Sequence, residues 1–392
     1  MVAMMRHWYI LLQIPLVQAV NWTAFLNELV GNNNVTLKPY KGDAARAGFD
    51  CPQHGQCGSC VRDGCGWCKS ESRCMRLNAS CGSGHEQTIG QPGDCPPVAP
   101  RETLFSREEA REMGRYASAS YYDFPDQHGL PPAAQVVKTF HFQLGLWDSA
   151  FGFIALDRQA NRIVLAFRGT ETLTQVSVEL LFHNLVPFHG DKQVRVNEFF
   201  FRAANDLLPQ LSPVLQDLES NCSRCQLWVT GHSLGASMAL LAAYNVSFWT
   251  RHAPVLYTFG QPRSVNGAFA RMVEERIPRI YRLVNAADPV PHIPLCTRGK
   301  LQIVGKMTGC LDDKPGGYHH VGMELWFPYG DYINGIMCDY RECVGIPKGE
   351  DLTCADGLSF PHDVNVLDHH GYWRVLEHGF CGVAQASQAI LV

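Results

Sequence analysis

The stretch LWVTGHSLGASMALLAAY, residues 227–244, restricts the fold more than any other segment of the chain. A short β-prone run ends at Gly231, and a long Ala- and Leu-rich run with helical composition follows at once. Ser233 therefore lies in a Gly-x-Ser-x-Gly pattern on a strand-to-helix turn, with Gly235 as its last residue. In such a turn the glycines avoid clashes, and the serine hydroxyl is presented at the N-terminus of the helix. We predict that Ser233 is a nucleophile rather than an ordinary turn residue.

Strand-like and helix-like segments alternate around this turn. Apolar runs predict strands at 136–142, 151–157, 162–169, 255–260 and 279–285. Helical spacing predicts a helix behind the capping box Ser106-x-x-Glu109, and another over 199–219 that breaks around Pro209 and Pro213. This alternation predicts an α/β domain with a largely parallel sheet.

A serine hydroxyl becomes nucleophilic when a base accepts its proton and a third group orients that base. In a sheet of this kind the acid and the histidine follow the nucleophile in chain order. Asp288 comes directly after the strand predicted at 279–285 and opens a proline-rich loop, so we predict that it is the acid. The simpler interpretation is an Asp-Pro turn. Asp312 and Asp313 are rival acids, but they stand in a Gly/Pro/Lys loop with no strand before it.

The base must be a histidine further along the chain. The histidines that follow Asp288 are His292, His319, His320, His362, His369, His370 and His378. A base has to reach the acid with one ring nitrogen and the serine with the other, which favours a late loop that folds back over the sheet. His369 and His370 stand in such a stretch, NVLDHHGYW, and this argument leaves both open. His232 precedes the nucleophile, and we interpret it as structural.

The reaction also needs hydrogen-bond donors for the oxygen of a tetrahedral intermediate. The backbone N–H of Leu234, directly after the nucleophile, is one predicted donor. Thr170, at the end of the strand predicted at 162–169, could supply a second N–H and a hydroxyl. This chemistry requires no cofactor and no metal ion.

The N-terminus has the features of a secretory signal peptide. A short basic start precedes an apolar run to about Val17, and cleavage is predicted after Ala19, so residues 1–19 would be removed. Neither this run nor any later one is long enough to span a membrane. The 16 cysteines form two even groups, within 51–95 and within 222–381, as intra-domain disulfides of a secreted protein would. Sequons compatible with this route stand at Asn21, Asn34, Asn78, Asn221 and Asn245.

The segment 50–96 is rich in Cys and Gly and poor in large aliphatic residues. It cannot bury much apolar area, so cross-links must hold it together. Its two Cys-x2-Cys pairs would also suit zinc, but the signal segment and the even count favour disulfides. Prolines over 96–102 indicate a linker before a second domain over 101–392. The net charge of −4 gives no reason to expect a nucleic-acid partner.

Within the cysteine-rich segment, CysGlyTrpCys at 65–68 with Cys74 six residues on resembles a PSI (plexin–semaphorin–integrin) module. The resemblance implies a structural or positioning element without catalysis. A protein partner that binds through this module is compatible with the resemblance.

The second domain resembles the class 3 (fungal-type) lipases. The motifs that carry this resemblance, in the family's order, are FRGT (167–170), GHSLGA (231–236), YTFGQPR (257–263), VNAADPVPHIP (284–294), HVGMELW (320–326) and VLDHHGYW (366–373). The resemblance implies an α/β-hydrolase fold with a catalytic triad of Ser233, Asp288 and His369. It also implies an oxyanion hole formed by Thr170 and Leu234. By the same comparison, His320 belongs to a structural strand motif.

The chain departs from the family pattern in two places. His369 follows Asp288 by 81 residues, a longer gap than expected, and the excess is placed in a Cys-containing insertion over 329–354. The family's lid corresponds to 172–188, which is apolar and long enough to cover an acyl pocket but lacks the usual Asp-Trp signature.

These features together predict a secreted serine hydrolase that cleaves acylglycerol esters through an acyl-serine intermediate. The expected partner is a lipid or another ester, at an interface, with no nucleic acid and no transmembrane segment. The alternatives are a phospholipase, a feruloyl-type esterase, or a non-catalytic adhesion or binding protein with a hydrolase-like domain.

Overall fold

A computed structural model of the chain describes residues 51, 57–62, 65–71, 73–82, 88–90, 105–144, 148–170, 184–294, 317–328, 340–344, 349–351, 353–358 and 365–372. The predicted signal peptide, the linker prolines and the rival acids Asp312 and Asp313 lie outside these ranges, as do His362 and His378. No helix within them is long and apolar enough to cross a membrane.

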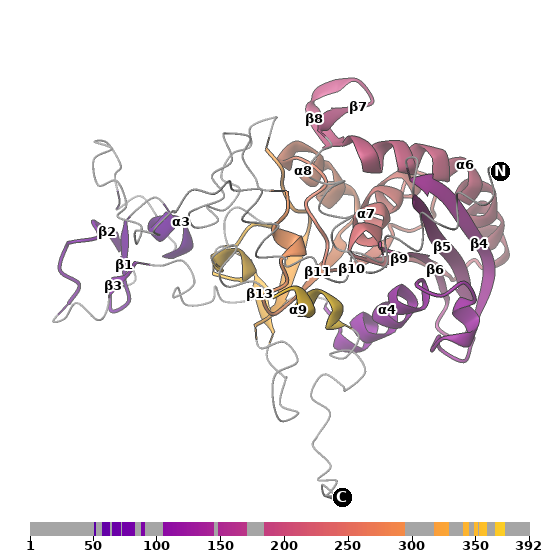
Figure 1. Ribbon diagram of the computed structural model, residues 1–392, viewed down its shortest axis with the longest axis horizontal. Helices are drawn as coiled ribbons and strands as arrows, with labels where there is room; N and C mark the ends of the chain where they lie inside the picture. The colour runs from indigo at the N-terminus through magenta and orange to yellow at the C-terminus, as the bar shows by residue number, and fades with distance from the viewer. Residues whose placement is uncertain are drawn as a thin grey trace, which may run out of the picture.

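A single large sheet organises the second domain (Figure 1). Its strands are β4 (Ala134–Leu144), β5 (Asp148–Asp157), β6 (Arg162–Phe167), β9 (Gln226–His232), β10 (Val255–Phe259), β11 (Arg279–Asn285), β12 (Met323–Phe327) and β13 (Arg341–Cys343). They lie in the order β13-β12-β11-β10-β9-β6-β5-β4. The central strands from β6 to β12 pair in parallel, whereas β4, β5 and β13 are added antiparallel at the two edges. The largely parallel sheet predicted from the alternating pattern is therefore confirmed.

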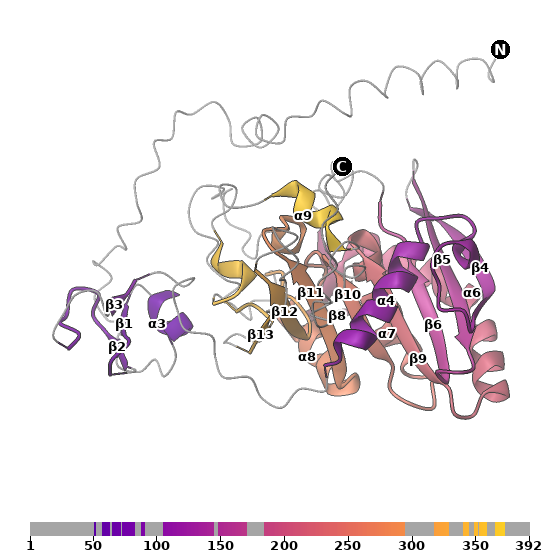
Figure 2. The ribbon, with the colours of Figure 1, turned by 90° about the horizontal axis from the view of Figure 1, so that it is seen from below.

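Helices cover both faces of this sheet, as Figure 2 shows. The helices of this domain are α4 (Arg107–Ala119), α6 (Glu198–Asn221), α7 (Leu234–Val246), α8 (Gly267–Arg276) and α9 (Val366–His370), with short 3-10 turns η4 (Pro125–Gln127), η5 (Val290–His292) and η6 (Ala355–Gly357). Apolar residues of α6, α7 and α8 form one core with the sheet, and those of α4 form a second core on the opposite face. Helix α7 is buried along almost its whole length, which explains its lack of a polar face.

Helix α6 corrects one prediction. It runs unbroken through Pro209 and Pro213, where a break was expected. Both prolines lie on the exposed side, while Leu207, Leu211 and Leu215 pack continuously on the buried side. The carbonyls that lose their partners therefore face solvent, where water can satisfy them, and the buried face holds the helix together.

The predicted lid, 172–188, falls mostly outside the described residues. Its last part forms β7 (Leu185–Phe188), which pairs antiparallel with β8 (Asp191–Asn197) in a separate ribbon. The lid therefore stays a prediction for residues 172–183.

The cysteine-rich segment is a disulfide-bonded module with little regular structure. It contains α3 (Cys57–Arg62) and a small antiparallel sheet of β1 (Gly66–Cys68), β2 (Arg73–Met75) and β3 (Thr88–Ile89). Its described disulfides are Cys51–Cys65, Cys60–Cys74 and Cys68–Cys81. Cys57 is disulfide-bonded as well, so all four thiols of the two Cys-x2-Cys pairs are used and the zinc alternative is wrong.

Candidate active site

Ser233 occupies a tight corner between β9 and α7. Its backbone has φ 59° and ψ −130°, a region that residues with a side chain rarely adopt. A Cβ on Gly231 would lie 2.3 Å from the carbonyl oxygen of Gly235, and one on Gly235 would lie 2.5 Å from that of Phe167. Both glycines are needed because the corner packs directly against itself and against β6.

Asp288 and His369 form a buried pair beside this corner. The Nδ1 atom of His369 lies 3.0 Å and 2.9 Å from the two carboxylate oxygens of Asp288, and both side chains are buried. The carboxylate of Asp288 accepts a hydrogen bond from the Nδ1–H group, which leaves Nε2 as the basic atom. Within the described part of the chain, His369 Nε2 and Ser233 Oγ are both buried and lack a hydrogen-bond partner. These are the two atoms between which the predicted proton transfer would occur.

The carboxylate of Asp288 accepts two further hydrogen bonds. The hydroxyl of Tyr372 donates to Oδ2 at 2.6 Å, and the backbone N–H of Val290 donates to Oδ1 at 2.9 Å. Burial raises the pKa of Tyr372 well above its usual value, and the neighbouring Asp288 raises it further, so the phenol remains a donor. Tyr372 was not among the residues predicted from the sequence, although it stands in the HHGYW stretch three residues after His369.

Gly260 lies directly behind this pair. It has φ +57°, and a Cβ there would lie 2.9 Å from Asp288 Oδ2 and 3.0 Å from both His369 Cε1 and Tyr372 Cε2. Only a glycine combines this backbone conformation with so close an approach. Gly260 stands in the YTFGQPR motif, but the sequence assigned it no role in the site.

His232 supports the histidine from the opposite side. Burial lowers the pKa of His232 well below its usual value, so the ring is neutral and only one nitrogen carries a proton. The carbonyl oxygen of His369, 2.9 Å from Nε2, can only accept, so Nε2 donates to it. Nδ1 then accepts from the hydroxyl of Tyr121 at 2.7 Å. His232 thus holds the backbone of His369, which gives the predicted structural role a definite contact.

Helix α9 is docked onto the loop that carries the acid. The backbone N–H of Asn365 donates to Ala287 O at 2.8 Å, and the N–H of Ala287 donates to the carboxylate of Asp368 at 3.0 Å. These contacts bring His369 to Asp288. The neighbouring His370 is exposed and makes none of the described hydrogen bonds to Asp288. His292 lies in the loop that carries Asp288, but its Nδ1 atom binds Asp356, and His320 binds the carbonyl oxygen of Pro291 in the same loop.

The predicted oxyanion residues flank the corner. Gly169, just before Thr170, packs so closely that a Cβ on it would lie 2.9 Å from the Cβ of Ser233. Leu234 is the first residue of α7, next to the nucleophile. Thr170 follows the end of β6, and Leu234 begins α7 directly after β9 and Ser233. Because β6 and β9 are neighbouring parallel strands, the two residues stand at the same edge of the sheet, as an oxyanion hole would require.

One group of potential metal ligands occurs in the described ranges. Glu324 lies close to Cys343 and Cys354. The two cysteines are bonded to each other, so neither offers a thiolate, and the group does not fit a metal ion.

Comparison with known proteins shows which family the chain resembles. A family profile described as "Lipase (class 3)" matches residues 164–298, and one described as "Plexin repeat" matches residues 50–96. Lipase ZK262.3 of Caenorhabditis elegans is 30% identical over 295 residues, which cover 70% of this chain and 81% of that protein. The "Secreted mono- and diacylglycerol lipase A" of Penicillium cyclopium is 28% identical over 206 residues, 48% of this chain and 66% of its own.

Solved structures with a similar fold include lipases as well. The crystal structure of a lipase from Rhizopus microsporus var. chinensis superposes with a TM-score of 0.55 at 24% identity, covering 74% of this chain and 96% of that one. Together with the nematode relative, this similarity shows that the chain belongs to the class 3 lipase family, as a carboxylic ester hydrolase with an α/β-hydrolase fold and an N-terminal plexin-repeat (PSI) module.

Proposed function

We propose that the protein is an extracellular acylglycerol lipase that works through an acyl-serine intermediate. The observation that carries the proposal is the buried Asp288–His369 pair, in which Nε2 of His369 has no hydrogen-bond partner, as is also true of the buried hydroxyl of Ser233. This arrangement has the three functions that a serine hydrolase needs: a nucleophile, a base, and an acid that orients the base.

The reaction would follow in two halves. His369 accepts the proton of Ser233 as the hydroxyl attacks the ester carbonyl, and the imidazolium formed is stabilised by Asp288. The backbone N–H groups of Leu234 and Thr170 stabilise the oxyanion, a contribution worth about 2.7–4 kcal/mol for each donor. His369 then protonates the leaving alcohol. Water, activated by the same histidine, releases the fatty acid and restores Ser233.

The family membership and the chemistry of the chain support the substrate class. The Penicillium relative is named for mono- and diacylglycerols. The sequence of 172–188 is apolar, in keeping with a lid or acyl-binding wall over 172–183 and with a lipid substrate. A water-soluble ester substrate would not require an apolar cover over its binding pocket. A substrate panel of tributyrin, phosphatidylcholine vesicles and methyl ferulate separates this proposal from the phospholipase and feruloyl-type alternatives, and we expect tributyrin to be cleaved fastest.

Several features support an extracellular location. The plexin-repeat module depends on disulfides, which form and persist in oxidising compartments. The N-terminal residues 1–19 have the pattern of a signal peptide. We assign residues 50–96 to the module and 101–392 to the hydrolase domain, and we expect the module to bind a protein partner or to position the enzyme.

The test is the Ser233→Ala variant assayed on tributyrin. Removing a nucleophile of this kind leaves only the residual rate that binding and the oxyanion hole supply, so we expect a loss of at least about 10³-fold in kcat. The Ser237→Ala variant, which removes another buried hydroxyl four residues away on α7, is the matched control and should keep its activity within a few-fold. Equal hydrolysis by the parent and Ser233→Ala would refute the proposed mechanism.

A further inference from the structure

The acid loop, residues 286–294, is held by buried side chains that take no part in the proposed proton transfer. His320 donates from Nε2 to the carbonyl oxygen of Pro291 at 2.7 Å. The backbone N–H of Arg263 donates to Ile293 O at 2.9 Å. The loop is thus fixed at several points beyond Asp288.

One side chain of this loop is bound directly by a carboxylate. His292 is fully buried, and its Nδ1 atom lies 3.2 Å from Asp356 Oδ1. The same oxygen accepts from Arg263 Nη2 at 2.8 Å. Glu350 binds the rest of that guanidinium, with 3.0 Å to Nε and 2.7 Å to Nη2. We call Arg263, Glu350 and Asp356 the acid–arginine cluster.

The charges in this cluster are arranged so that Asp356 stays ionised. Burial raises the pKa of Glu350 to about 8. Burial acts on Asp356 too, but Arg263 and His292 outweigh it and hold the pKa of Asp356 well below its usual value. An ionised Asp356 is an acceptor only, so His292 must donate to it from Nδ1. A charge-assisted bond of this kind fixes the ring of His292 more firmly than a neutral one would.

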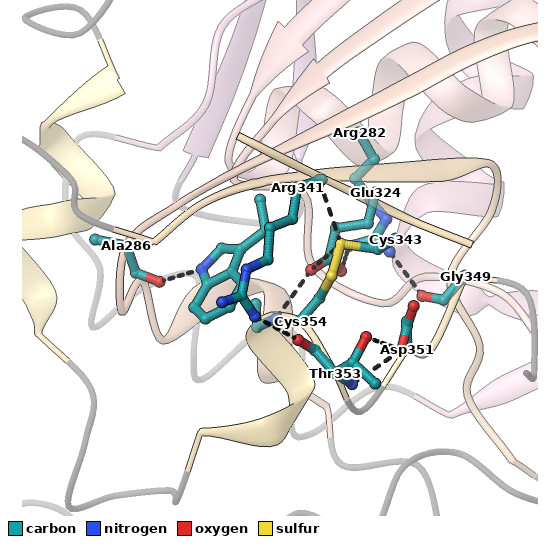
Figure 3. Close-up of a disulfide and its surroundings, with 11 residues drawn as sticks. Arg282, Ala286, Glu324, Arg341, Cys343, Gly349, Asp351, Thr353 and Cys354 are labelled. Atoms are coloured by element: carbon teal, nitrogen blue, oxygen red, sulfur yellow. Dashed lines mark hydrogen bonds and ion pairs between the residues drawn. A yellow bond between two sulfur atoms is a disulfide. The ribbon is translucent and has the colours of Figure 1, made fainter. Parts of the chain in front are cut away.

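Both acids of the cluster come from a segment far along the chain. Residues 349–357 form a strap that is closed onto β13 by the Cys343–Cys354 disulfide (Figure 3). The strap is anchored further by Arg282, which donates to Gly349 O at 2.6 Å. Glu324, on β12, accepts from the backbone N–H of Ala355 at 3.1 Å.

We infer that Asp356 is a positioning residue for Asp288, acting through the hydrogen bond from His292 to fix the acid loop in the orientation that aligns His369. This inference rests on the proposed triad. It assigns a role to the strap, which lies within the long interval of 81 residues between the acid and the base. Neither Asp356 nor His292 touches the reacting atoms, so both act only through the geometry of the loop.

Catalysis is sensitive to such geometry, because a displacement of about 1 Å far from the reacting atoms can cost about 10²-fold in rate. The His292→Leu variant fills the cavity but cannot donate to Asp356. We expect kcat on p-nitrophenyl butyrate to fall about 10- to 100-fold with KM within about twofold of the parent. We also expect the acidic limb of the kcat/KM profile to move to lower pH, because a misplaced carboxylate favours the protonated imidazole less.

The conservative variant His292→Asn restores a donor near the Nδ1 position and should recover most of kcat. The matched control is Tyr257→Phe, which removes a buried hydroxyl in the middle of β10 that donates to Glu109 of α4 at 2.9 Å and makes no described contact with the triad. It should lower the melting temperature and leave kcat and the pH profile unchanged. If His292→Leu does not fold, Asp356→Asn tests the same bond, with an expected loss of about 3- to 10-fold in kcat.

Two results would overturn the inference. One is a folded His292→Leu protein with the kcat and pH profile of the parent. The other is an equal loss in His292→Leu and His292→Asn, which would show that the donor is irrelevant. Labelling of the parent at Ser233 with a fluorophosphonate separates this inference from the proposed function. An unlabelled parent would refute the triad itself, whereas a labelled parent with a fully active His292→Leu variant would refute only the role of Asp356.

Discussion

At the scale of single residues, the candidate site depends on close approaches as much as on reactive groups. Ser233, Asp288 and His369 could be selected from the sequence because their chemistry and chain order are restrictive. Tyr372 and Gly260 could not, because their importance comes from atoms that are remote in the chain and meet only in the folded protein. Chain order alone left His369 and His370 both open; the family resemblance favoured His369, and its ring is the one that binds Asp288 in the structure.

The Gly260→Ala substitution tests the close approach behind the triad. The new Cβ would lie 2.9 Å from Asp288 Oδ2 and would sit on a backbone with φ +57°. We expect a loss of about 1–3 kcal/mol in the free energy of unfolding from the strained backbone. We expect kcat to fall at least about tenfold, because the carboxylate must shift.

The control for this substitution is Gly190→Ala. Gly190 also has a positive φ, +88°, but no heavy atom lies within 4 Å of the Cβ position. It should show a similar loss of stability in urea unfolding with an unchanged kcat. Equal kcat values for the two variants would contradict the proposed role of Gly260.

At the scale of helices and strands, sequence patterns predicted an element correctly where its apolar residues are also the ones buried in the fold. The strands around the nucleophile and the capped start of α4 follow from hydrophobic spacing, and the Ser106 side chain accepts from the N–H of Glu109 as predicted. Helix α6 shows the limit of such reasoning, because its prolines stop a helix only when the lost hydrogen bonds are buried. The strap was placed in an insertion only as far as Cys354, so that Asp356 falls beyond it, and the part of Glu350 and Asp356 in the charged cluster had no local signature.

The strap gives a prediction at this scale. Removing its disulfide with Cys343→Ser/Cys354→Ser should lower the free energy of unfolding by about 2–3 kcal/mol, because the bridge closes a short loop of sequence separation 11. It should also lower kcat, because Glu350 and Asp356 lose their support. Urea unfolding and initial rates on p-nitrophenyl butyrate measure both effects.

The comparison protein is Cys222→Ser/Cys225→Ser. Its disulfide has a sequence separation of only 3 and lies at the turn before β9, at the opposite end of that strand from Ser233. It should lose less stability and keep its kcat. Parent-like kcat in the Cys343→Ser/Cys354→Ser protein would argue against the strap as a support for the acid loop.

At the scale of the whole molecule, the stability should depend on pH through buried neutral histidines. Burial lowers the pKa of His320 well below 6.5, and Arg282 and Arg263 lower it further. A group with a lowered pKa in the folded state contributes stability above its unfolded pKa, and this contribution is lost as the pH falls. The contribution of His320 to the free energy of unfolding should therefore decrease from pH 7 towards pH 5, by up to about 1.4 kcal/mol per pH unit. The raised pKa of Glu350 acts in the opposite direction, because a buried carboxyl that is protonated in the folded state adds stability as the pH falls. The effect of His320 is therefore measured as a difference between the parent and a variant.

The variant His320→Gln isolates this effect. Glutamine keeps a donor for the carbonyl oxygen of Pro291 but does not titrate in this range. When both proteins are measured in urea at pH 7, 6 and 5, the free energy of unfolding of the variant minus that of the parent should increase as the pH falls, because only the parent loses the His320 contribution. Parallel curves for the two proteins would show that His320 is not the group responsible.

The organisation of the chain into a disulfide-bonded module and a catalytic domain could be predicted from cysteine density and motif order. These signals are strong because a short segment without a core needs cross-links, and because a nucleophile, an acid and a base must appear in a fixed sequence. The preferred acyl chain and the identity of the module's partner could not be predicted, because they depend on the shape and chemistry of binding surfaces that short motifs do not specify.

The central claim is that Ser233, activated by His369 and Asp288, forms the acyl-enzyme. The most direct test is to label the purified full-length protein with a fluorophosphonate probe and to map the modified residue by peptide mass spectrometry. The account predicts one modified peptide with the probe on Ser233, and loss of labelling after heat denaturation or in the Ser233→Ala variant. Active, folded protein that remains unlabelled at Ser233, or that carries the probe on another serine, would contradict it.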